Sequence, residues 1–194
     1  MSELVNKEAD IAKKVFKPAL WASAYLAKLN TVENGISKEL TIGFRDGYPR
    51  FNIRTLTSDD VEIGKTTSVP FTNIMMKSFS KMLQLVVGGK NKSFRVTSRN
   101  NKFTTYRTDE IEVRGIIEAR MHPDYVAIHI FKDNEEHVFP ITVDNIYFGV
   151  EVEGKEVTNS KDVSLILAST YADLLSNMID NYLAIMVDRQ SKTS

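Results

Sequence analysis

Apolar and polar residues alternate along much of the middle of this chain, which is the pattern of half-buried β-strands. Leu40, Ile42 and Phe44 alternate with polar residues up to Asp46-Gly47, and the same alternation resumes after that pair. An Asp-Gly pair between two alternating runs is a strong hairpin signal, because both residues tolerate the positive φ angles of a two-residue turn. We therefore expect a β-hairpin here and antiparallel sheet as a main component of the fold.

Further strands are expected downstream, separated by residues that favour turns. The alternation predicts strands at 92–98, 102–108, 110–120, 124–132 and 136–143. Arg99-Asn100-Asn101 and Asp133-Asn134 are the predicted turns between them. Another strand pair is expected within 146–157, turning at Glu153-Gly154.

Three regions show the three- and four-residue spacing of helices. Residues 1–35 are predicted to form a helical N-terminal segment that stops at Asn34-Gly35. A mid-chain helix is expected from an N-cap at Ser68, with Pro70 in its first turn, to Gly88-Gly89. A long C-terminal helix is predicted over 160–189, capped by Ser160. The chain is therefore predicted to be one α+β domain over 1–194, with antiparallel sheets or an open barrel of hairpins.

The C-terminal helix carries two apolar stripes, one containing Leu167 and Tyr171 and the other Ala168 and Leu175. A surface this wide needs cover on more than one side, from the sheet with the N-terminal helices or from another subunit. A homo-oligomer is expected on this basis. Asp173 and other acidic residues interrupt the apolar run, which disfavours a membrane span.

Composition narrows the class of protein further. The 194 residues include no cysteine, so disulfides, thiolate chemistry and cysteine-based zinc sites are all excluded. The N-terminus lacks the layout of a signal peptide, and a cytoplasmic location is expected.

Charge is divided unevenly along the chain although the net charge is zero. Residues 1–107 hold 18 Lys and Arg against 9 Asp and Glu, whereas residues 108–194 hold 7 against 16. The segment from Gly64 to Thr108 contains nine basic residues and no acidic one. A basic segment of this kind is typical of a surface that binds phosphates, whereas the alternative is a solvated surface neutralised in space by the acidic half.

Motifs for catalysis, metals or cofactors are not recognisable, and a non-enzymatic protein is expected. Gly64-Lys65-Thr66 resembles the end of a phosphate-binding loop, but Asp59 stands where that loop requires glycine. His129 and His137 could face each other across the hairpin at Asp133-Asn134 and form a metal site, although a coincidence of strand pairing is the favoured interpretation.

Basic and aromatic residues on strands and loops instead indicate nucleic-acid binding. Proteins that bind single strands combine a cationic groove with aromatic platforms on which bases stack. The candidate binding residues are Arg45, Tyr48, Arg50, Arg54, Lys65, Lys90, Lys92, Arg95, Arg99, Lys102, Tyr106 and Arg107. Strand alternation places Arg95 toward the ligand and Phe94 toward the core. The mid-chain helix has too few polar side chains to read a duplex, and RNA stays open as an alternative to DNA.

The order of hairpins, a helix after Ser68, a second set of strands and a long closing helix resembles Whirly-type single-stranded DNA-binding proteins. The chain also resembles the single-stranded-DNA-binding RNA polymerase cofactors of short-tailed phages. The lysine-glycine-lysine signature of plant Whirly proteins is absent, with Gly64-Lys65 and Gly89-Lys90 as partial matches. The resemblance implies sequence-tolerant binding of single-stranded DNA in phage replication or transcription, a homo-oligomer, and an RNA polymerase as a partner. The alternative is an adaptor that assembles head to tail through its basic and acidic halves.

Overall fold

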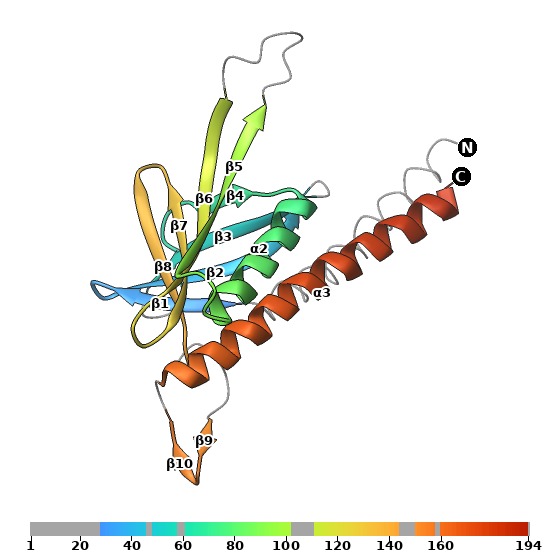
Figure 1. Cartoon of the computed structure of the whole chain (residues 1–194). Helices are drawn as coiled ribbons and strands as arrows, with labels where there is room; N and C mark the ends of the chain where they lie inside the picture. Colours follow the sequence, from blue (N-terminus) through green and yellow to red (C-terminus); the bar gives the residue numbers. More distant parts are fainter. Residues whose placement is uncertain are drawn as a thin grey trace.

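The computed structural model describes residues 28–45, 48–57, 61–101, 111–143, 150–157 and 160–193. Within them lie two four-stranded antiparallel sheets, a short strand pair and two helices, the second of which is long (Figure 1). This is the predicted α+β class with its mid-chain and C-terminal helices. The predicted helices before residue 28 lie outside the described residues.

The first sheet contains four strands in the order β1-β2-β3-β4. Their bounds are β1 Leu29–Glu33, β2 Ile36–Arg45, β3 Tyr48–Leu56 and β4 Thr67–Pro70. The predicted hairpin across Asp46-Gly47 is confirmed, with Arg45 paired to Tyr48.

The prediction of helix through residue 35 is wrong at its end. Leu29 is buried and lies opposite Leu40 of β2, and Asn34-Gly35 turns the chain with φ angles of 52° and 75°. Both residues were expected to stop a helix, but an Asn-Gly pair with positive φ angles also suits a two-residue hairpin turn. The partner strand decides between the two, because it supplies the hydrogen bonds of β1.

The helix α2 (Asn73–Val87) begins later than predicted. Ser68 and Pro70 belong to β4, where Ser68 lies opposite Asn52 of β3. The N-cap is Thr72, whose hydroxyl accepts a hydrogen bond from the Met75 backbone N–H at 3.2 Å. The predicted stop at Gly88-Gly89 is confirmed, and Gly89 has the positive φ angle that favours glycine at a helix end.

The second sheet has the order β5-β6-β7-β8. Its strands are β5 Ser93–Asn101, β6 Ile111–Met121, β7 Val126–Lys132 and β8 Glu135–Ile141. The predicted turn at Asp133-Asn134 is confirmed, but the turn predicted at 99–101 is wrong because β5 continues through Asn101. The strand predicted at 102–108 lies outside the described residues. The short pair β9 (Glu151–Val152) and β10 (Lys155–Glu156) turns at Glu153-Gly154 as predicted.

The helix α3 (Lys161–Thr193) begins as predicted at Ser160, whose hydroxyl accepts a hydrogen bond from the Val163 backbone N–H at 3.2 Å. Its first turns are joined to the second sheet by Ser164, which donates to the Ile141 carbonyl and accepts from the Val126 N–H. Tyr182 stacks on Phe44 of β2 at a centroid distance of 4.2 Å. Within the described residues, neither α2 nor α3 contains the long, uncharged apolar stretch that a membrane-spanning helix needs.

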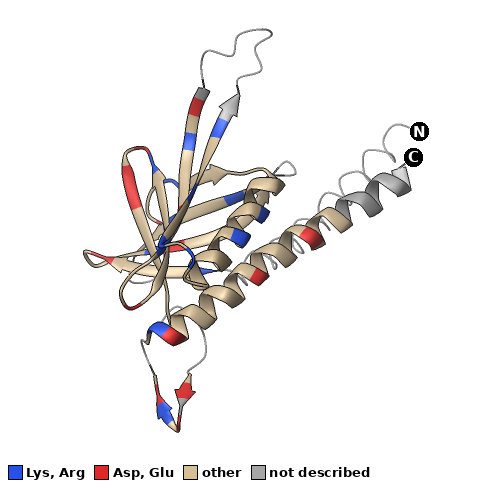
Figure 2. Cartoon of the chain, viewed as in Figure 1, with Lys and Arg blue, Asp and Glu red and all other residues tan. Residues whose placement is uncertain are grey.

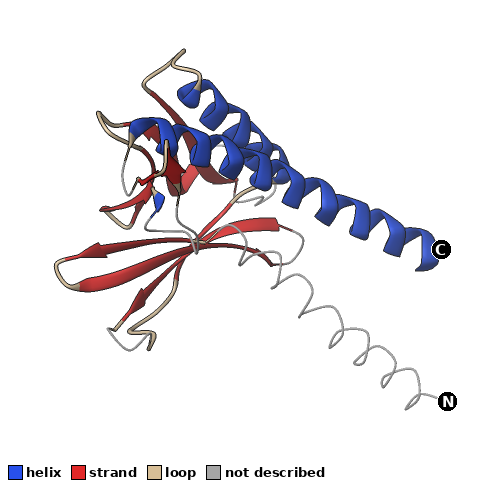
Figure 3. Cartoon of the chain, turned by 90° about the horizontal axis from the view of Figure 1, so that it is seen from below, coloured by secondary structure: helices blue, strands red, loops and turns tan. Residues whose placement is uncertain are grey.

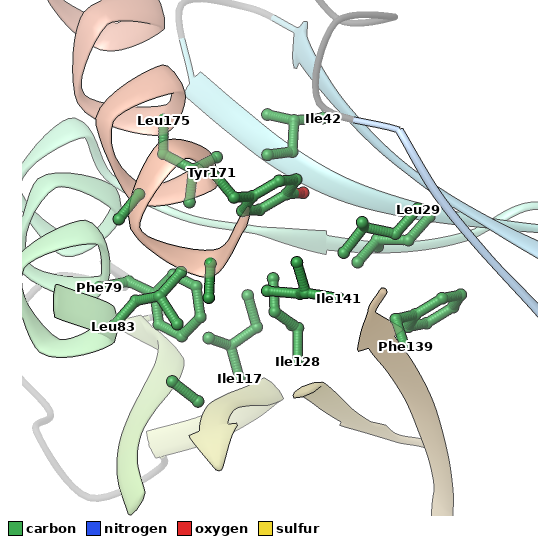
Figure 4. Close-up of a cluster of buried hydrophobic side chains, with 14 of the residues drawn as sticks. Leu29, Ile42, Phe79, Leu83, Ile117, Ile128, Phe139, Ile141, Tyr171 and Leu175 are labelled. Carbon is green, nitrogen blue, oxygen red and sulfur yellow. The ribbon is translucent and has the colours of Figure 1, made fainter. Parts of the chain in front are cut away.

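The hydrophobic core lies where the inner faces of the two sheets meet α2 and α3 (Figure 4). Both predicted stripes of α3 contribute to it, because Leu167, Tyr171, Ala168 and Leu175 are all buried. Seen from below, α2 and α3 lie on one side of the first sheet, so its opposite face has no described helix over it (Figure 3).

The two sheets contact each other at two places, where β1 lies near β8 and where β4 crosses β6. At Gly115, which has a φ of 153°, an added Cβ would lie only 2.7 Å from the side chain of Val69 on β4. The Ser98 hydroxyl of β5 donates to the Pro70 carbonyl at the same crossing. Beyond this point β5 and β6 continue as a two-stranded arm that projects past β4 (Figure 1).

Candidate nucleic-acid interface

The outer face of β3 presents Tyr48, Arg50, Asn52 and Arg54, since these residues alternate with the buried Phe51 and Ile53. Tyr48 is 54% exposed. The Nε atom of Arg50 is buried and has no hydrogen-bond partner among the described residues. Arg50 also has no carboxylate partner among the described residues, so its charge is not compensated within the described fold. Tyr48 and Arg50 thus form one small cationic and aromatic site on an open sheet.

Arg54 on the same face is compensated by carboxylates. Its guanidinium lies 3.4 Å from Glu39 and 3.2 Å from Glu62, and Glu39 is also paired with Lys28. Hydrogen bonding from Thr66, with the nearby Arg54, keeps the pKa of Glu62 below its ordinary value. Arg54 therefore has less charge available for a phosphate than Arg50 has.

Three of the candidate lysines, Lys65, Lys90 and Lys92, lie in connections between elements and are exposed. Lys65 follows Gly64 between β3 and β4, and the other two join α2 to β5. None of the three has an acidic partner among the residues that the structure describes.

Arg95 on β5 points outward, as predicted, while Phe94 packs against the core. Its Nε and Nη2 atoms donate to one oxygen of Glu118 at 3.0 and 2.6 Å. Arg120 donates to the other oxygen of Glu118 at 2.8 Å. Burial alone would raise the pKa of Glu118, but the hydrogen bonds and charges of Arg120 and Arg95 hold it below the ordinary value.

The arm adds one basic residue, Arg114, that is not among the candidates predicted from the sequence. Ser98 lies opposite Gly115 and Arg99 lies opposite Val113, so Arg114 is the extra residue of a β-bulge. Arg99 is exposed and Arg114 is half-buried, and neither has an acidic partner among the described residues. Arg114 was overlooked because it belongs to the acidic half of the sequence. Strand pairing brings it to the base of the arm beside Arg99.

The remaining candidate residues are not placed in detail. Arg45 belongs to β2, but its side chain is outside the described part of the chain, as are Lys102, Tyr106 and Arg107 altogether.

The basic residues that are described do not form one continuous track (Figure 2). The candidate binding residues among them occupy the outer face of β3, the connections at Lys65 and Lys90, the outer face of β5 and the arm. Two cations of the acid-free segment are paired with the acidic half, namely Arg95 with Glu118 and Lys77 with Asp180 at 2.5 Å. Part of the predicted charge is therefore neutralised within the fold.

The triplet Gly64-Lys65-Thr66 does not form a phosphate-binding loop. It leads into strand β4 rather than a helix, and the Thr66 hydroxyl donates to Glu62 at 2.5 Å. In a phosphate-binding loop this hydroxyl would bind the magnesium ion of the nucleotide, whereas here it is hydrogen-bonded to a carboxylate.

The suggested contact between His129 and His137 is wrong. In the β7–β8 register, His137 lies opposite Ile130 and His129 lies opposite Val138, so the two rings point to opposite faces of the sheet. His129 instead contacts His122, with 2.9 Å between the two Nε2 atoms, and its Nδ1 lies 2.7 Å from Glu136. Within the described residues, no three His, Asp or Glu side chains are grouped so that they could hold a metal ion.

Comparison with known proteins adds little to this geometry. No family model and no curated protein matches the chain. A solved structure of Trypanosoma bruciei MRP1/MRP2 aligns with a TM-score of 0.38 and 12% identity, over 76% of this chain and 81% of that chain. A similarity of this size carries no argument about fold or function.

Proposed function

We propose that this protein binds single-stranded DNA, largely independently of sequence and without catalysis, in phage replication or transcription. One observation carries the proposal: nine described basic residues have no carboxylate partner among the described residues, although the chain has as many acids as bases. Six of the nine lie on β3, on the arm or in the connections around Lys65 and Lys90. These six are Arg50, Lys65, Lys90, Lys92, Arg99 and Arg114. Cations without protein partners favour nucleic-acid binding, because a lysine or arginine that neutralises a phosphate releases the counterions condensed on the nucleic acid.

The open face of β3 supports a single strand as the ligand. A single strand needs flat aromatic or guanidinium surfaces for its bases beside cations for its phosphates, which Tyr48 and Arg50 provide on neighbouring outward positions. A helix that reads a duplex must have its polar side free to enter a groove. The polar side of α2 is engaged with α3, because Lys77 pairs with Asp180 and Gln84 donates to Asp173 at 2.8 Å.

A homo-oligomer and an RNA polymerase partner belong to the same proposal. The oligomer is supported by apolar side chains that α3 leaves exposed, Ile166 at 65% and Leu183 at 39%. The polymerase partner rests on the resemblance to phage transcription cofactors alone.

Fluorescence anisotropy with labelled oligo-dT, oligo-rU and a duplex at several salt concentrations tests the proposal. If roughly five phosphates are neutralised, the slope of log K against log salt should be about −3.5 for a single strand. Arg50→Gln and Lys90→Gln should each make that slope less steep by somewhat under one. Lys155→Gln, in the distant β9–β10 hairpin, is the matched control and should leave it unchanged.

Absence of binding to all three ligands at micromolar protein would contradict the proposal. That result would favour the adaptor that assembles through its charged halves. Tighter binding to oligo-rU than to oligo-dT would move the proposal from DNA to RNA.

A further inference from the structure

The side chain of Arg95 is held in an unusual position for a residue that would bind a phosphate. Its guanidinium carbon lies 4.9 Å from the ring centroid of Phe131, and the side chain remains 51% exposed. Two of its nitrogens donate to the same carboxylate oxygen of Glu118. The guanidinium therefore has an aromatic ring on one side, a carboxylate at its edge and solvent around the remainder.

Glu118 is itself fixed by a network that crosses the outer face of the second sheet. Only 4% of its side chain is exposed, and its second oxygen accepts from Arg120. Arg120 lies 3.8 Å from Glu136, which also contacts His129 at 2.7 Å. Side chains from β5, β6, β7 and β8 thus form one network that orients Arg95 in the absence of ligand.

This arrangement separates two properties of arginine that usually act together. The charge of Arg95 is compensated by the adjacent carboxylate, so little of it is left to attract a phosphate. Its planar face is not consumed by the ion pair, because the hydrogen bonds lie in the plane of the guanidinium. Proteins that bind single-stranded nucleic acids stack splayed bases on guanidinium planes as they do on aromatic rings.

We propose that Arg95, supported by Phe131 and fixed by Glu118, is a stacking platform for one unpaired nucleobase. This inference rests on the proposed function and names the part of the ligand that the second sheet contacts. The bound single-stranded DNA would then contact the protein in two ways. Cations that lack acidic partners would hold its phosphates, and Arg95 would stack against one of its bases. The core side chains of this sheet, such as Ile117 and Ile128, point to its other face and leave the platform clear of α2 and α3.

The test compares oligo-dT with an oligonucleotide of the same length made only of abasic residues. Arg95→Lys keeps the positive charge but removes the planar face. We expect it to weaken binding to oligo-dT by roughly 5- to 150-fold, the range for one stacked base, and to leave binding to the abasic strand unchanged. The salt slope should also stay the same. Lys90→Gln should give the opposite result, weakening both ligands equally and reducing the slope.

Phe131→Leu provides a second variant, since it removes the supporting ring but keeps an apolar side chain. It should selectively weaken oligo-dT as well, and thermal unfolding of both variants would confirm that each is folded. Equal weakening of both ligands by Arg95→Lys, with a reduced slope, would overturn the inference in favour of a phosphate contact. No effect on either ligand would also overturn it and leave Arg95 as a structural ion pair. Failure of the wild-type protein to bind any single strand would refute the proposed function itself.

Discussion

Replacing Gly115 by alanine would test how the two sheets meet. Gly115 lies on β6 with a φ of 153°, a conformation that residues with a Cβ rarely adopt. The new methyl group would lie 2.7 and 2.8 Å from the two γ-carbons of Val69, which is fully buried on β4. The Phe131 carbonyl oxygen, at 3.3 Å, limits movement in the other direction.

Two costs follow from this geometry. A non-glycine residue in a sparsely populated backbone region costs about 1 to 3 kcal/mol. Forcing a methyl group into a packed interior costs about 1 to 3 kcal/mol more. Because both apply at Gly115, we expect Gly115→Ala to lower the free energy of unfolding by about 2 to 6 kcal/mol.

Urea denaturation followed by circular dichroism measures this loss. The matched control is Gly35→Ala, because Gly35 also has a positive φ, 75°, but nothing lies within 4 Å of the added atom. The control should show only the backbone cost, about 1 to 2 kcal/mol. Val69→Ala removes the clashing atoms, so the double variant should be more stable than the sum of the two single losses predicts. Equal losses for Gly115→Ala and Gly35→Ala, with additive behaviour at Val69, would refute the close crossing of β4 and β6.

Three other expected outcomes concern stability. Ser164→Ala leaves the Val126 N–H and the Ile141 carbonyl without their buried partner, and should cost about 2 kcal/mol in urea denaturation; a neutral result would contradict the anchoring of α3. Thr72→Ala removes the N-cap of α2 and should cost about 1 kcal/mol by the same assay, whereas Thr72→Ser should restore most of it. Burial lowers the pKa of His122 below its ordinary 6.5, so the unfolded chain takes up a proton that the folded chain does not. Its contribution to stability is complete above about pH 6.5 and is lost as pH falls through the folded pKa. Melting temperatures between pH 7.5 and 5 should therefore fall more for the wild type than for His122→Gln, and parallel curves would contradict this.

Several elements could be predicted from the sequence because their signals are local. The turns at Asp133-Asn134 and Glu153-Gly154, the stop at Gly88-Gly89 and the cap at Ser160 are found where predicted. In each case the residues that make the structure are neighbours in the chain. Their backbone preferences or short side-chain hydrogen bonds act within one turn, so no distant partner is needed.

Elements that depend on a distant partner were predicted less well. Residues 29–33 form a strand because β2 pairs with them, and Ser68 and Pro70 form a strand because β3 does. The local sequence of each segment is equally compatible with a helix. The long-range hydrogen bonds of a sheet decide the outcome, and spacing within one segment does not reveal them.

The α+β class, the mid-chain helix, the long C-terminal helix and the excess of cations in the first half could all be predicted from the order of the residues. Tertiary structure alone decided which of those cations have carboxylate partners. Arg95 meets Glu118 because β5 pairs with β6, and Arg114 joins Arg99 because a bulge shifts that pairing. Counting charges along a chain gives their number, but electrostatic interaction depends on distance in space, which only the folded sheet sets.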